Sequence, residues 1–279
     1  MLNGRRVAVV LPAYNAANTL ERTIAELDRT IVDDLILVDD NSSDQTVELA
    51  QSLGLTPTTH SRNLGYGANQ KTCYRLALDR GADIIVMVHP DYQYSPRLVP
   101  ALAAMIAYGE YDLALGSRIL AQNAVRGGMP LYKYVANRTL TAFENVVMGA
   151  KLSEYHTGLR AYARSLLEAV RFDLNSDDFI FDNQLLAQAM AASARIGELS
   201  CPTRYDTNSS SINFRRSVMY GIGCVRTSVE FWLFAHGVRS YAYLTGAEPL
   251  RRADEQSGVE AAGSGAEDPS GHWGERTRP

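Results

Sequence analysis

Polar side chains gather at the ends of two apolar runs, which occupy positions 7–13 and 35–38. The polar side chains are those of Tyr14, Asn15, Asp39 and Asp40, and Pro12 stands near the end of the first run. A carboxylate at the end of a buried strand is costly unless it is bound, so Asp39 is a candidate to accept hydrogen bonds from a nucleotide base or a ribose hydroxyl. The alternative is that Asp39 and Asp44 only cap the helix that follows. We expect capping by Asp44 and ligand contact by Asp39.

The elements that position these residues alternate between short β-branched runs and amphipathic helical runs. Strands are predicted at 7–13, 35–38, 84–88 and 113–115, and helices at 18–31, 45–53, 67–80 and 98–108. The first helix is expected to begin with a capping box formed by Asn18 and Glu21. This alternation is typical of an α/β fold with a central, mostly parallel sheet flanked by helices. The polar clusters then share the carboxyl edge of the sheet, where such folds bind ligands.

The pattern is looser after residue 120. Helices are predicted at 131–148, 181–192 and 217–243, and strands at 157–163 and 195–202, with a polar loop at 203–214. From residue 247 the composition changes to Gly, Ser, Glu and Asp without periodicity, which predicts a disordered tail at 247–279. We therefore expect a single domain at 1–246.

The composition is that of an ordinary globular chain of 279 residues, with 46% apolar residues and a formal net charge of −4. This charge gives no general attraction to nucleic acid, so phosphate binding depends on individually placed arginines. The cysteines, Cys73, Cys201 and Cys224, lack metal-ligand spacing and are expected to be buried free thiols. No run reaches the roughly 20 apolar residues that a membrane helix needs. With no N-terminal signal expected either, we predict a cytoplasmic protein.

Five short strings follow predicted strands in a fixed order. They are PAYN at 12–15, VDDNSSDQT at 38–46, NLGYGA at 63–68, HPDYQYSP at 89–96 and GSR at 116–118. In this order they resemble family 2 glycosyltransferases of the dolichyl-phosphate mannosyltransferase-like branch, and the resemblance covers about residues 6–235. It implies a GT-A fold, a UDP- or GDP-sugar donor, a divalent metal and inversion at the anomeric carbon. The donor-binding residues that it implies include Pro12, Tyr14, Asn15, Asp39, Asp40, Gly65, Gly67, Lys71 and Asp91.

The resemblance also implies a metal site in the string at 89–96. A metal that bridges the two phosphates neutralises the charge of the departing nucleoside diphosphate. Asp91 would supply a carboxylate and Gln93 a neutral oxygen, hard donors that suit Mn²⁺ or Mg²⁺. The sequence departs from the family at His89, where the Asp-x-Asp metal motif has its first Asp. Three interpretations stay open: His89 is a nitrogen ligand that favours Mn²⁺, a donor to phosphate, or a structural residue.

Arginines are expected to complete the binding of the phosphates. Arg118 matches the family position that faces the substrate phosphates, and its planar guanidinium can hold two oxygens at once. Arg204 and Arg126 are further candidates, although surface arginines are usually only solvated. Ser210 belongs to a polar run beside Arg204 that resembles the family's loop over the donor, and the alternative is a flexible linker.

The acceptor decides whether this chemistry needs a general base. A polyprenyl phosphate is already an oxyanion at neutral pH, whereas a hydroxyl acceptor needs a carboxylate within hydrogen-bond reach. Asp182 matches by position the acidic motif that often serves as base in the family. The predicted catalytic residues are therefore Asp182, Asp91 and Arg118, with helix capping by Asp178 as the competing interpretation of this segment.

We therefore predict an inverting glycosyltransferase with a nucleotide-binding half at 1–118 and an acceptor half at 119–246. The leading acceptor is a polyprenyl phosphate. The alternatives are a hydroxyl of a soluble glycan or small metabolite, and a non-catalytic nucleotide-sugar-binding module. The aromatic residues at 231–234 and 241–243 would face a membrane or lipid, the core, or an oligomer contact. No nucleic acid partner is expected, and both a homo-oligomer and attachment to the inner face of the membrane stay open.

Overall fold

The structure is a computed structural model that describes residues 1–120, 124–125, 127–202, 214–246 and 250. Three of the predicted site residues, Arg126, Arg204 and Ser210, lie outside the described residues. So does the predicted tail, apart from residue 250. The three cysteines are free and buried, as expected.

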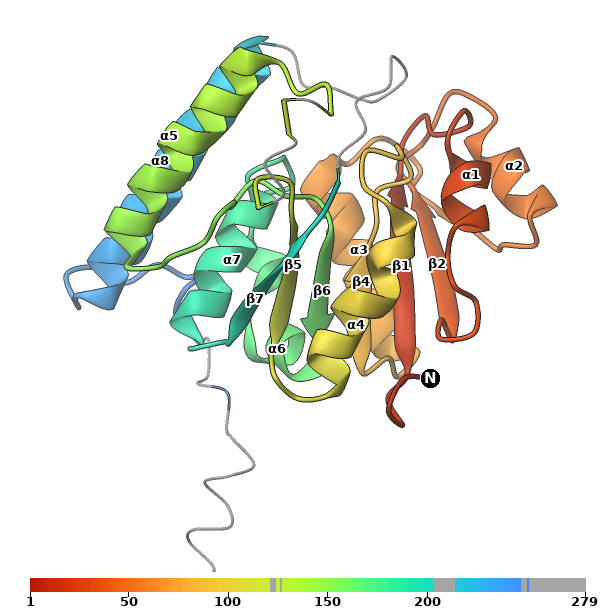
Figure 1. The fold of residues 1–279 in the computed structure, drawn as a ribbon, viewed down its shortest axis with the longest axis horizontal. Helices are drawn as coiled ribbons and strands as arrows, with labels where there is room; N and C mark the ends of the chain where they lie inside the picture. The colour runs from red at the N-terminus through yellow and green to blue at the C-terminus, as the bar shows by residue number, and fades with distance from the viewer. Residues whose placement is uncertain (121–123, 126, 203–213, 247–249, 251–279) are drawn as a thin grey trace, which may run out of the picture. The chain divides into compact units, whose positions relative to one another are not determined.

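The described residues form one mixed sheet of seven strands in the order β3-β2-β1-β4-β6-β5-β7 (Figure 1). The strands are β1 (Val7–Ala13), β2 (Asp34–Asp39), β3 (Thr58–Thr59), β4 (Ile84–Met87), β5 (Leu113–Ser117), β6 (Arg160–Ala163) and β7 (Ile196–Ser200). All neighbours are parallel except β6, which runs antiparallel between β4 and β5. The predicted α/β fold with a mostly parallel sheet is confirmed.

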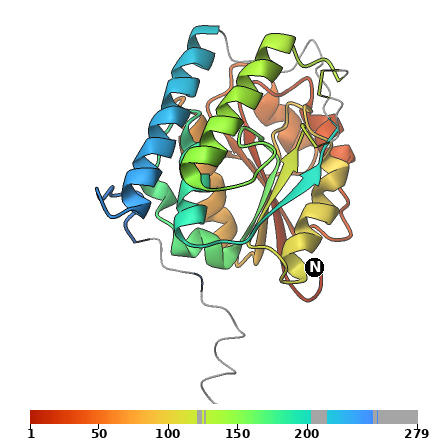
Figure 2. The same ribbon diagram turned by 60° about the vertical axis from the view of Figure 1, so that its left-hand side comes forward.

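Helices cover both faces of this sheet. They are α1 (Leu20–Ala25), α2 (Thr46–Ser52), α3 (Tyr66–Asp79), α4 (Val99–Ala107), α5 (Leu131–Met148), α6 (Arg164–Ala169), α7 (Phe181–Ala191) and α8 (Phe214–Ala235). The helix α4 lies on one face, and α3, α6 and α7 lie on the other (Figures 1 and 2). Because it is covered on both faces, β1 is buried along its whole length, which explains its uninterrupted apolar sequence.

The helices α5 and α8 form an outer pair beside α7 (Figures 1 and 2). Gly223 of α8 allows a close approach to α7, because a Cβ there would lie 3.0 Å from the Ile180 side chain. The helix α8 ends at Ala235 rather than at the predicted residue 243, and Gly237 follows in the left-handed conformation typical of helix ends. No helix among the described residues is long and apolar enough to cross a bilayer.

The predicted capping box of Asn18 and Glu21 is wrong. The N-cap residue of α1 is Thr19, and no side-chain hydrogen bond caps this helix. A backbone turn starts the helix instead, since the Ala16 carbonyl accepts from the amides of Thr19 and Leu20. The Thr19 hydroxyl donates to the Pro90 carbonyl and so ties this turn to the segment after β4.

Candidate functional site

The parallel strands β1, β2, β4 and β5 bring the predicted site residues to one edge of the sheet. Asp39 is the last residue of β2, and Arg118 directly follows β5. Asp91 comes four residues after the end of β4. Because these strands share one direction, their carboxyl ends lie at the same edge. Three residues that are distant in the chain therefore share the edge where α/β sheets bind ligands.

The turns after β1 and β2 are tied to each other. The buried Asp39 carboxylate accepts a hydrogen bond from the Ser42 amide at 2.9 Å and another from the Ser42 hydroxyl. That hydroxyl oxygen accepts from the Asn15 amide at 2.8 Å, and Asn15 Oδ1 accepts from the Ser43 amide at 2.9 Å. Tyr14 lies beside this network with 53% of its surface exposed. The network therefore fixes the positions of the two turns relative to each other, next to the exposed Tyr14.

Asp40 organises the loop before α3. Its carboxylate accepts from the amides of Leu64 and Gly65, both at 2.9 Å, and lies 2.7 Å from His60 Nδ1. The N-cap residue of α2 is Gln45, and no side-chain hydrogen bond caps this helix, so Asp44 is not its N-cap residue. Asp44 lies one residue earlier and accepts a hydrogen bond from the amide of Thr46, the first residue of α2, at 3.0 Å. Both acids therefore shape the backbone around the site, and a ligand contact by Asp40 stays a prediction.

The beginning of α3 packs against the segment that precedes α7. A Cβ on Gly65 would lie 2.6 Å from the Asp177 carbonyl oxygen, and one on Gly67 would lie 2.3 Å from the Ser176 carbonyl oxygen. The Gly67 amide donates to the Asp177 carbonyl at 2.7 Å, and Lys71 Nζ lies 2.7 Å from Asp177 Oδ1. These contacts explain both glycines and the lysine by packing, and their donor-binding role stays a prediction.

The segment after β4 holds the predicted metal ligands in a tight turn. Asp91 Oδ1 accepts from the Gln93 amide at 3.0 Å. Between them, Tyr92 adopts a left-handed backbone conformation with φ of 59° and is 4% exposed. Such strain needs support, which comes from the Arg22 guanidinium 3.8 Å above the Tyr92 ring and from a hydrogen bond of its hydroxyl to Glu26. The turn around Asp91 is thus rigidly held.

Tyr66 links His89 to Asp182. The Tyr66 hydroxyl donates to Asp182 Oδ2 at 2.6 Å and lies 2.9 Å from His89 Nε2, with the two rings stacked. Burial, with the Asp182 charge in second place, raises the pKa of Tyr66 well above its usual value, so the hydroxyl keeps its proton. His89 Nε2 therefore donates to the Tyr66 oxygen, and in a neutral imidazole Nδ1 is left as the acceptor. Asp182 is 6% exposed.

Arg118 is held by an acid that the sequence did not reveal. Its Nε donates to Glu154 Oε1 at 2.8 Å, its amide donates to Glu154 Oε2 at 2.7 Å, and its Nη2 donates to the His156 carbonyl at 2.7 Å. Burial opposes the charge on Glu154, but the Arg118 guanidinium outweighs it and holds the pKa of Glu154 below its usual value. The structure thus fixes the orientation of Arg118, and phosphate contact by this side chain stays a prediction.

Arg160 is a second buried cation that the sequence analysis missed. It is fully buried, and it donates from Nη1 to the Asp182 carbonyl and from Nη2 to the Tyr155 carbonyl, both at 2.9 Å. A charged residue inside the short apolar strand β6 is the signal that would have found it, because an isolated charge is costly to bury. Arg160 locks the start of α7, which carries Asp182, onto the sheet.

A further group of ionisable side chains lies where α5, α8 and the segment before β6 meet. One donor atom from each of Glu144, His156 and Cys224 lies within 4.8 Å of the others. His156 Nε2 faces Glu144 Oε2 at 3.2 Å, and His156 Nδ1 lies 3.0 Å from the Tyr220 hydroxyl. Asn183 donates to Glu144 Oε1 at 2.6 Å. These contacts join α5 and α8 to α7 as a buried polar network.

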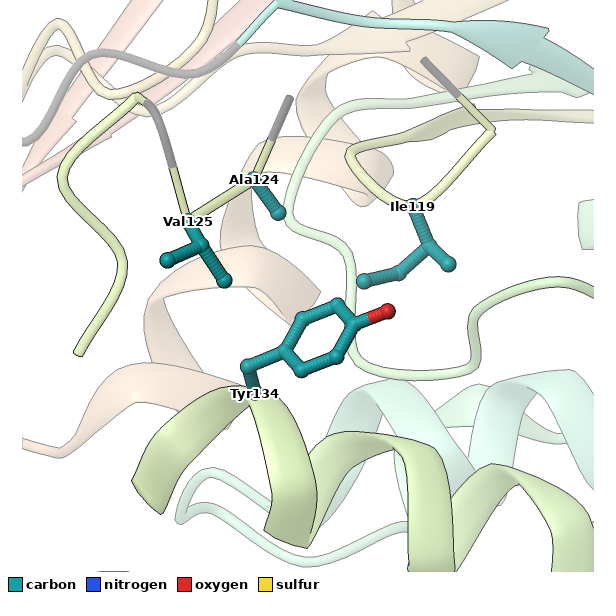
Figure 3. Close-up of a pocket in the computed structure, with 4 residues that line it drawn as sticks. All are labelled: Ile119, Ala124, Val125 and Tyr134. Carbon is teal, nitrogen blue, oxygen red and sulfur yellow. The ribbon is translucent and has the colours of Figure 1, made fainter. Parts of the chain in front are cut away.

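A cavity of about 250 Å³ lies against the first turn of α5 (Figure 3). Among the described residues, its lining consists of Ile119, Ala124, Val125 and Tyr134. The Tyr134 ring projects from the first turn of α5 between Ile119 on one side and Ala124 and Val125 on the other (Figure 3). One lining residue of this cavity, Ile119, directly follows Arg118, which is predicted to hold phosphate.

Comparison with known proteins identifies the relatives of this chain. A family model described as glycosyl transferase family 2 matches residues 8–171. An uncharacterized protein of Methanocaldococcus jannaschii is 28% identical over 210 residues, which are 75% of this chain and 86% of that protein. A UDP-N-acetylglucosamine–dolichyl-phosphate N-acetylglucosaminyltransferase of Methanococcus voltae is 26% identical, over 71% of this chain and 86% of the relative. An undecaprenyl-phosphate mannosyltransferase of Micrococcus luteus is 26% identical, over 70% of this chain and 82% of that protein.

Solved structures show the same fold. Glucosyl-3-phosphoglycerate synthase from Mycobacterium tuberculosis, in complex with Mn²⁺ and UDP-glucose, superposes with a TM-score of 0.63 at 22% identity. The match covers 85% of this chain and 81% of the synthase. The same enzyme has been solved with Mg²⁺ and UDP. The expected GT-A architecture is confirmed.

Proposed function

This chain belongs to glycosyl transferase family 2, and from that premise we propose that it moves a sugar, with inversion, from a nucleoside diphosphate sugar to a polyprenyl phosphate. The relatives from M. voltae and M. luteus are named for transfer to dolichyl phosphate and undecaprenyl phosphate, which favours this acceptor class. UDP- and GDP-sugars are the donor candidates. Residues 1–118 form the proposed nucleotide half, and residues 119–246 form the acceptor half.

The observation that carries the lipid acceptor is the cavity at the first turn of α5, whose described lining side chains are largely apolar. A polyprenyl phosphate joins a charged phosphate to an apolar chain, and Ile119 of this lining directly follows Arg118 in the chain. The remaining lining, Ala124, Val125 and the Tyr134 ring, suits isoprene units because burying apolar surface is favourable. A polar glycan would gain little from such a lining.

The donor would bind along the carboxyl edge of β1, β2 and β4. Asp39, with Tyr14 and Asn15 beside it, is the proposed contact for the base and the ribose. The donor set of Asp91 and Gln93 fits Mg²⁺ or Mn²⁺, because both side chains offer hard oxygens on a turn that is already rigid. A bound metal would neutralise charge on the departing diphosphate. His89 can join as a ligand only through Nδ1, since Nε2 is hydrogen-bonded to Tyr66.

The polyprenyl phosphate needs no protein base, because its oxygen is already negative at neutral pH. Arg118 would orient this phosphate, and Glu154 would keep the guanidinium in place. In this mechanism Asp182 positions other groups: it accepts from Tyr66 and thereby steadies His89. A change at Asp182 would then act through His89 rather than on the acceptor.

One observation favours transfer to a hydroxyl as a second candidate function. Asp182 Oδ1 is buried and has no hydrogen-bond partner among the described residues, while Oδ2 is held by Tyr66. An oriented carboxylate with one oxygen available is what a general base for a hydroxyl acceptor requires. The variant Asp182→Asn separates transfer to a hydroxyl from transfer to a polyprenyl phosphate. If Asp182 is the general base for a hydroxyl acceptor, the variant should lower the rate by about 10²–10⁴-fold.

The test is the partition of a labelled sugar. The purified chain is incubated with labelled UDP- and GDP-sugars, Mn²⁺ and a polyprenyl phosphate in detergent, and the products are extracted into organic solvent. Label in the organic phase that requires both the metal and the lipid supports the proposal. Label that stays in water with every donor, while a soluble acceptor is glycosylated, would overturn the lipid acceptor.

A further inference from the structure

We propose that the outer face of α8 binds an anionic membrane surface and so holds the site beside the bilayer. This inference deepens the proposed function, since a polyprenyl phosphate is held in a bilayer. It rests on the surface of α8 itself, and its test uses vesicles that contain no polyprenyl phosphate. Failure of the membrane contact can therefore be told apart from failure of the acceptor assignment.

An apolar stripe runs along the exposed side of α8. It consists of Val218, Ile222, Val225, Val229 and Trp232, which are 46%, 58%, 38%, 41% and 42% exposed. The spacing alternates between four and three residues, so at about 100° per residue the five positions stay within roughly 80° of the helix circumference. Exposed apolar residues in such an unbroken row mark an interaction surface rather than chance exposure.

The opposite side of α8 is buried against the rest of the protein. Cys224, Thr227 and Ser228 are at most 2% exposed, and Gly223 packs closely on Ile180. The helices α8 and α5 lie side by side as the outer pair (Figure 2). Rotation of α8 therefore cannot hide the stripe without breaking the packed side.

The charged side chains that reach the surface on α5 and α8 are all basic. Arg215, Arg216 and Arg226 are exposed, whereas Lys133 and Arg138 are half-buried and Arg138 donates to the Ser153 carbonyl at 2.8 Å. The two acids on these helices are buried: Glu144 is 0% exposed and Glu230 is 9% exposed. Glu230 offsets part of this charge, because it pairs with Arg226 at 2.8 Å. This basic character contrasts with the net charge of −4 for the whole chain.

This combination favours an anionic membrane over a second copy of the chain. Arg215 and Arg226 lie beside the stripe, and two copies paired through the stripe would bring these arginines together without exposed acids on α5 or α8 to pair with them, which opposes association. An anionic lipid surface complements the arginines, and the apolar stripe can enter the boundary between headgroups and acyl chains. Trp232 at one end of the stripe has the amphipathic ring favoured at such interfaces.

Exposed apolar side chains are also found at the start of α5, where the cavity lies. Tyr134 lines that cavity, and its neighbours on α5, Leu131, Tyr132 and Val135, are 65%, 58% and 54% exposed. A lipid that leaves the bilayer at the start of α5 would therefore meet apolar side chains up to the cavity. The membrane contact and the proposed acceptor site are thus linked through one helix.

Sedimentation with vesicles tests the proposal. The purified chain is mixed with vesicles of phosphatidylcholine alone and with vesicles that also contain phosphatidylserine. We expect binding to the anionic vesicles that weakens as salt is added. Replacing Ile222 and Val229 by Ser should weaken this binding by about tenfold or more, since each change removes a large apolar side chain from the contact. Replacing Arg215 by Gln should weaken it by about fivefold.

Matched controls change exposed residues of the same kinds elsewhere. Tyr108→Ser, at a position that is 67% exposed after α4, and Arg80→Gln, after α3, should leave vesicle binding unchanged. Thermal unfolding of each variant checks that the fold is kept, and turnover with detergent-dispersed polyprenyl phosphate should survive in the stripe variant.

Two results would overturn the membrane assignment. One is equal binding of the wild type and the stripe variant to anionic vesicles. The other is that light scattering shows a dimer for the wild type and a monomer for the variant with Ile222 and Val229 replaced by Ser, while neither protein binds vesicles. The stripe would then be the contact surface for a second copy of the chain. Vesicle binding as expected, without transfer of label to lipid, would leave this surface intact and remove only the proposed acceptor.

Discussion

Tyr66 couples two residues that lie far apart in the chain. Its hydroxyl joins His89 to Asp182, which is 116 residues away from Tyr66. Because the pKa of Tyr66 is raised, the hydroxyl remains a donor to Asp182 throughout the working pH range. The orientation of His89, in the turn that holds the predicted metal ligands, thus depends on a contact from α7.

Removal of this hydroxyl by Tyr66→Phe should lower the free energy of unfolding by about 1–3 kcal/mol, since the buried Asp182 carboxylate and the half-buried His89 ring lose their partner. The measurement is urea denaturation of the wild type and the variant. Tyr108→Phe is the matched control, because Tyr108 is 67% exposed and should change stability little. A Tyr66→Phe variant as stable as the control would contradict the coupling.

The pairing of Arg118 with Glu154 predicts a dependence on pH. Arg118 lowers the pKa of Glu154 in the folded protein, so the pair contributes stability above the unfolded value of 4.5 and loses it as pH falls through the folded value. Arg118→Met should therefore cost about 3–5 kcal/mol near neutral pH, because it leaves a buried carboxylate alone. The difference from the wild type should shrink below pH 4.5.

Urea titrations at several pH values check this expectation. Arg75→Met is the control, because Arg75 pairs with Asp173 at the surface, where such pairs contribute less than about 1 kcal/mol. An Arg118→Met deficit that stays constant with falling pH would mean that Glu154 is not the group responsible.

Sequence reasoning located the strand-end residues but missed the residues that support them. Asp39, Asp91 and Arg118 follow apolar runs, which is a local pattern that a single sequence displays. Tyr66 and Glu154 find their partners only through the fold, since 36 residues separate Glu154 from Arg118. Contacts of this kind follow from tertiary packing, which no spacing rule predicts.

At the scale of elements, the start of α3 is held against the segment that precedes α7. Gly67 lies against the Ser176 carbonyl oxygen, where a Cβ would come within 2.3 Å. That neighbour is backbone and cannot rotate away. The start of α3 can therefore keep its position only with glycine at this place.

Gly67→Ala should destabilise the protein and move α3 away from the segment before α7. We expect a clear fall in the thermal unfolding temperature, with weaker donor binding, because the backbone itself must shift. Gly221→Ala is the control: its Cβ would lie 3.7 Å from Leu140, and alanine is favoured over glycine inside a helix by up to about 1 kcal/mol. Equal behaviour of the two variants would refute the packing argument.

Periodicity predicts most of the helices and strands. It does not predict the direction of a strand in the sheet, and it does not reveal elements of only a few residues. The predicted strand at 157–163 is present as β6, yet its antiparallel direction depends on the path of the chain between β5 and β6. The helix expected at 18–31 ends at Ala25, and α6 and β3 are too short to give a periodic signal. Tertiary contacts set these features.

At the scale of the whole molecule, the proposed nucleotide site lies at the sheet edge, which carries Asp39 and Asp91. The proposed path of the lipid leads along apolar side chains at the start of α5 and past Tyr134 in the cavity. The outer pair of α5 and α8 adds the proposed membrane contact. A charged donor from water and an apolar acceptor from a bilayer could thus meet at one place.

The central claim is that the sheet edge binds a nucleoside diphosphate through a cation held by Asp91. Thermal unfolding with UDP or GDP, with and without Mn²⁺, tests it directly, since a ligand that binds only the folded state stabilises that state. We predict that one of the nucleotides raises the unfolding temperature of the wild type only when Mn²⁺ is present, and that Asp91→Asn abolishes this shift. The same shift without metal, or in Asp91→Asn, would contradict the claim.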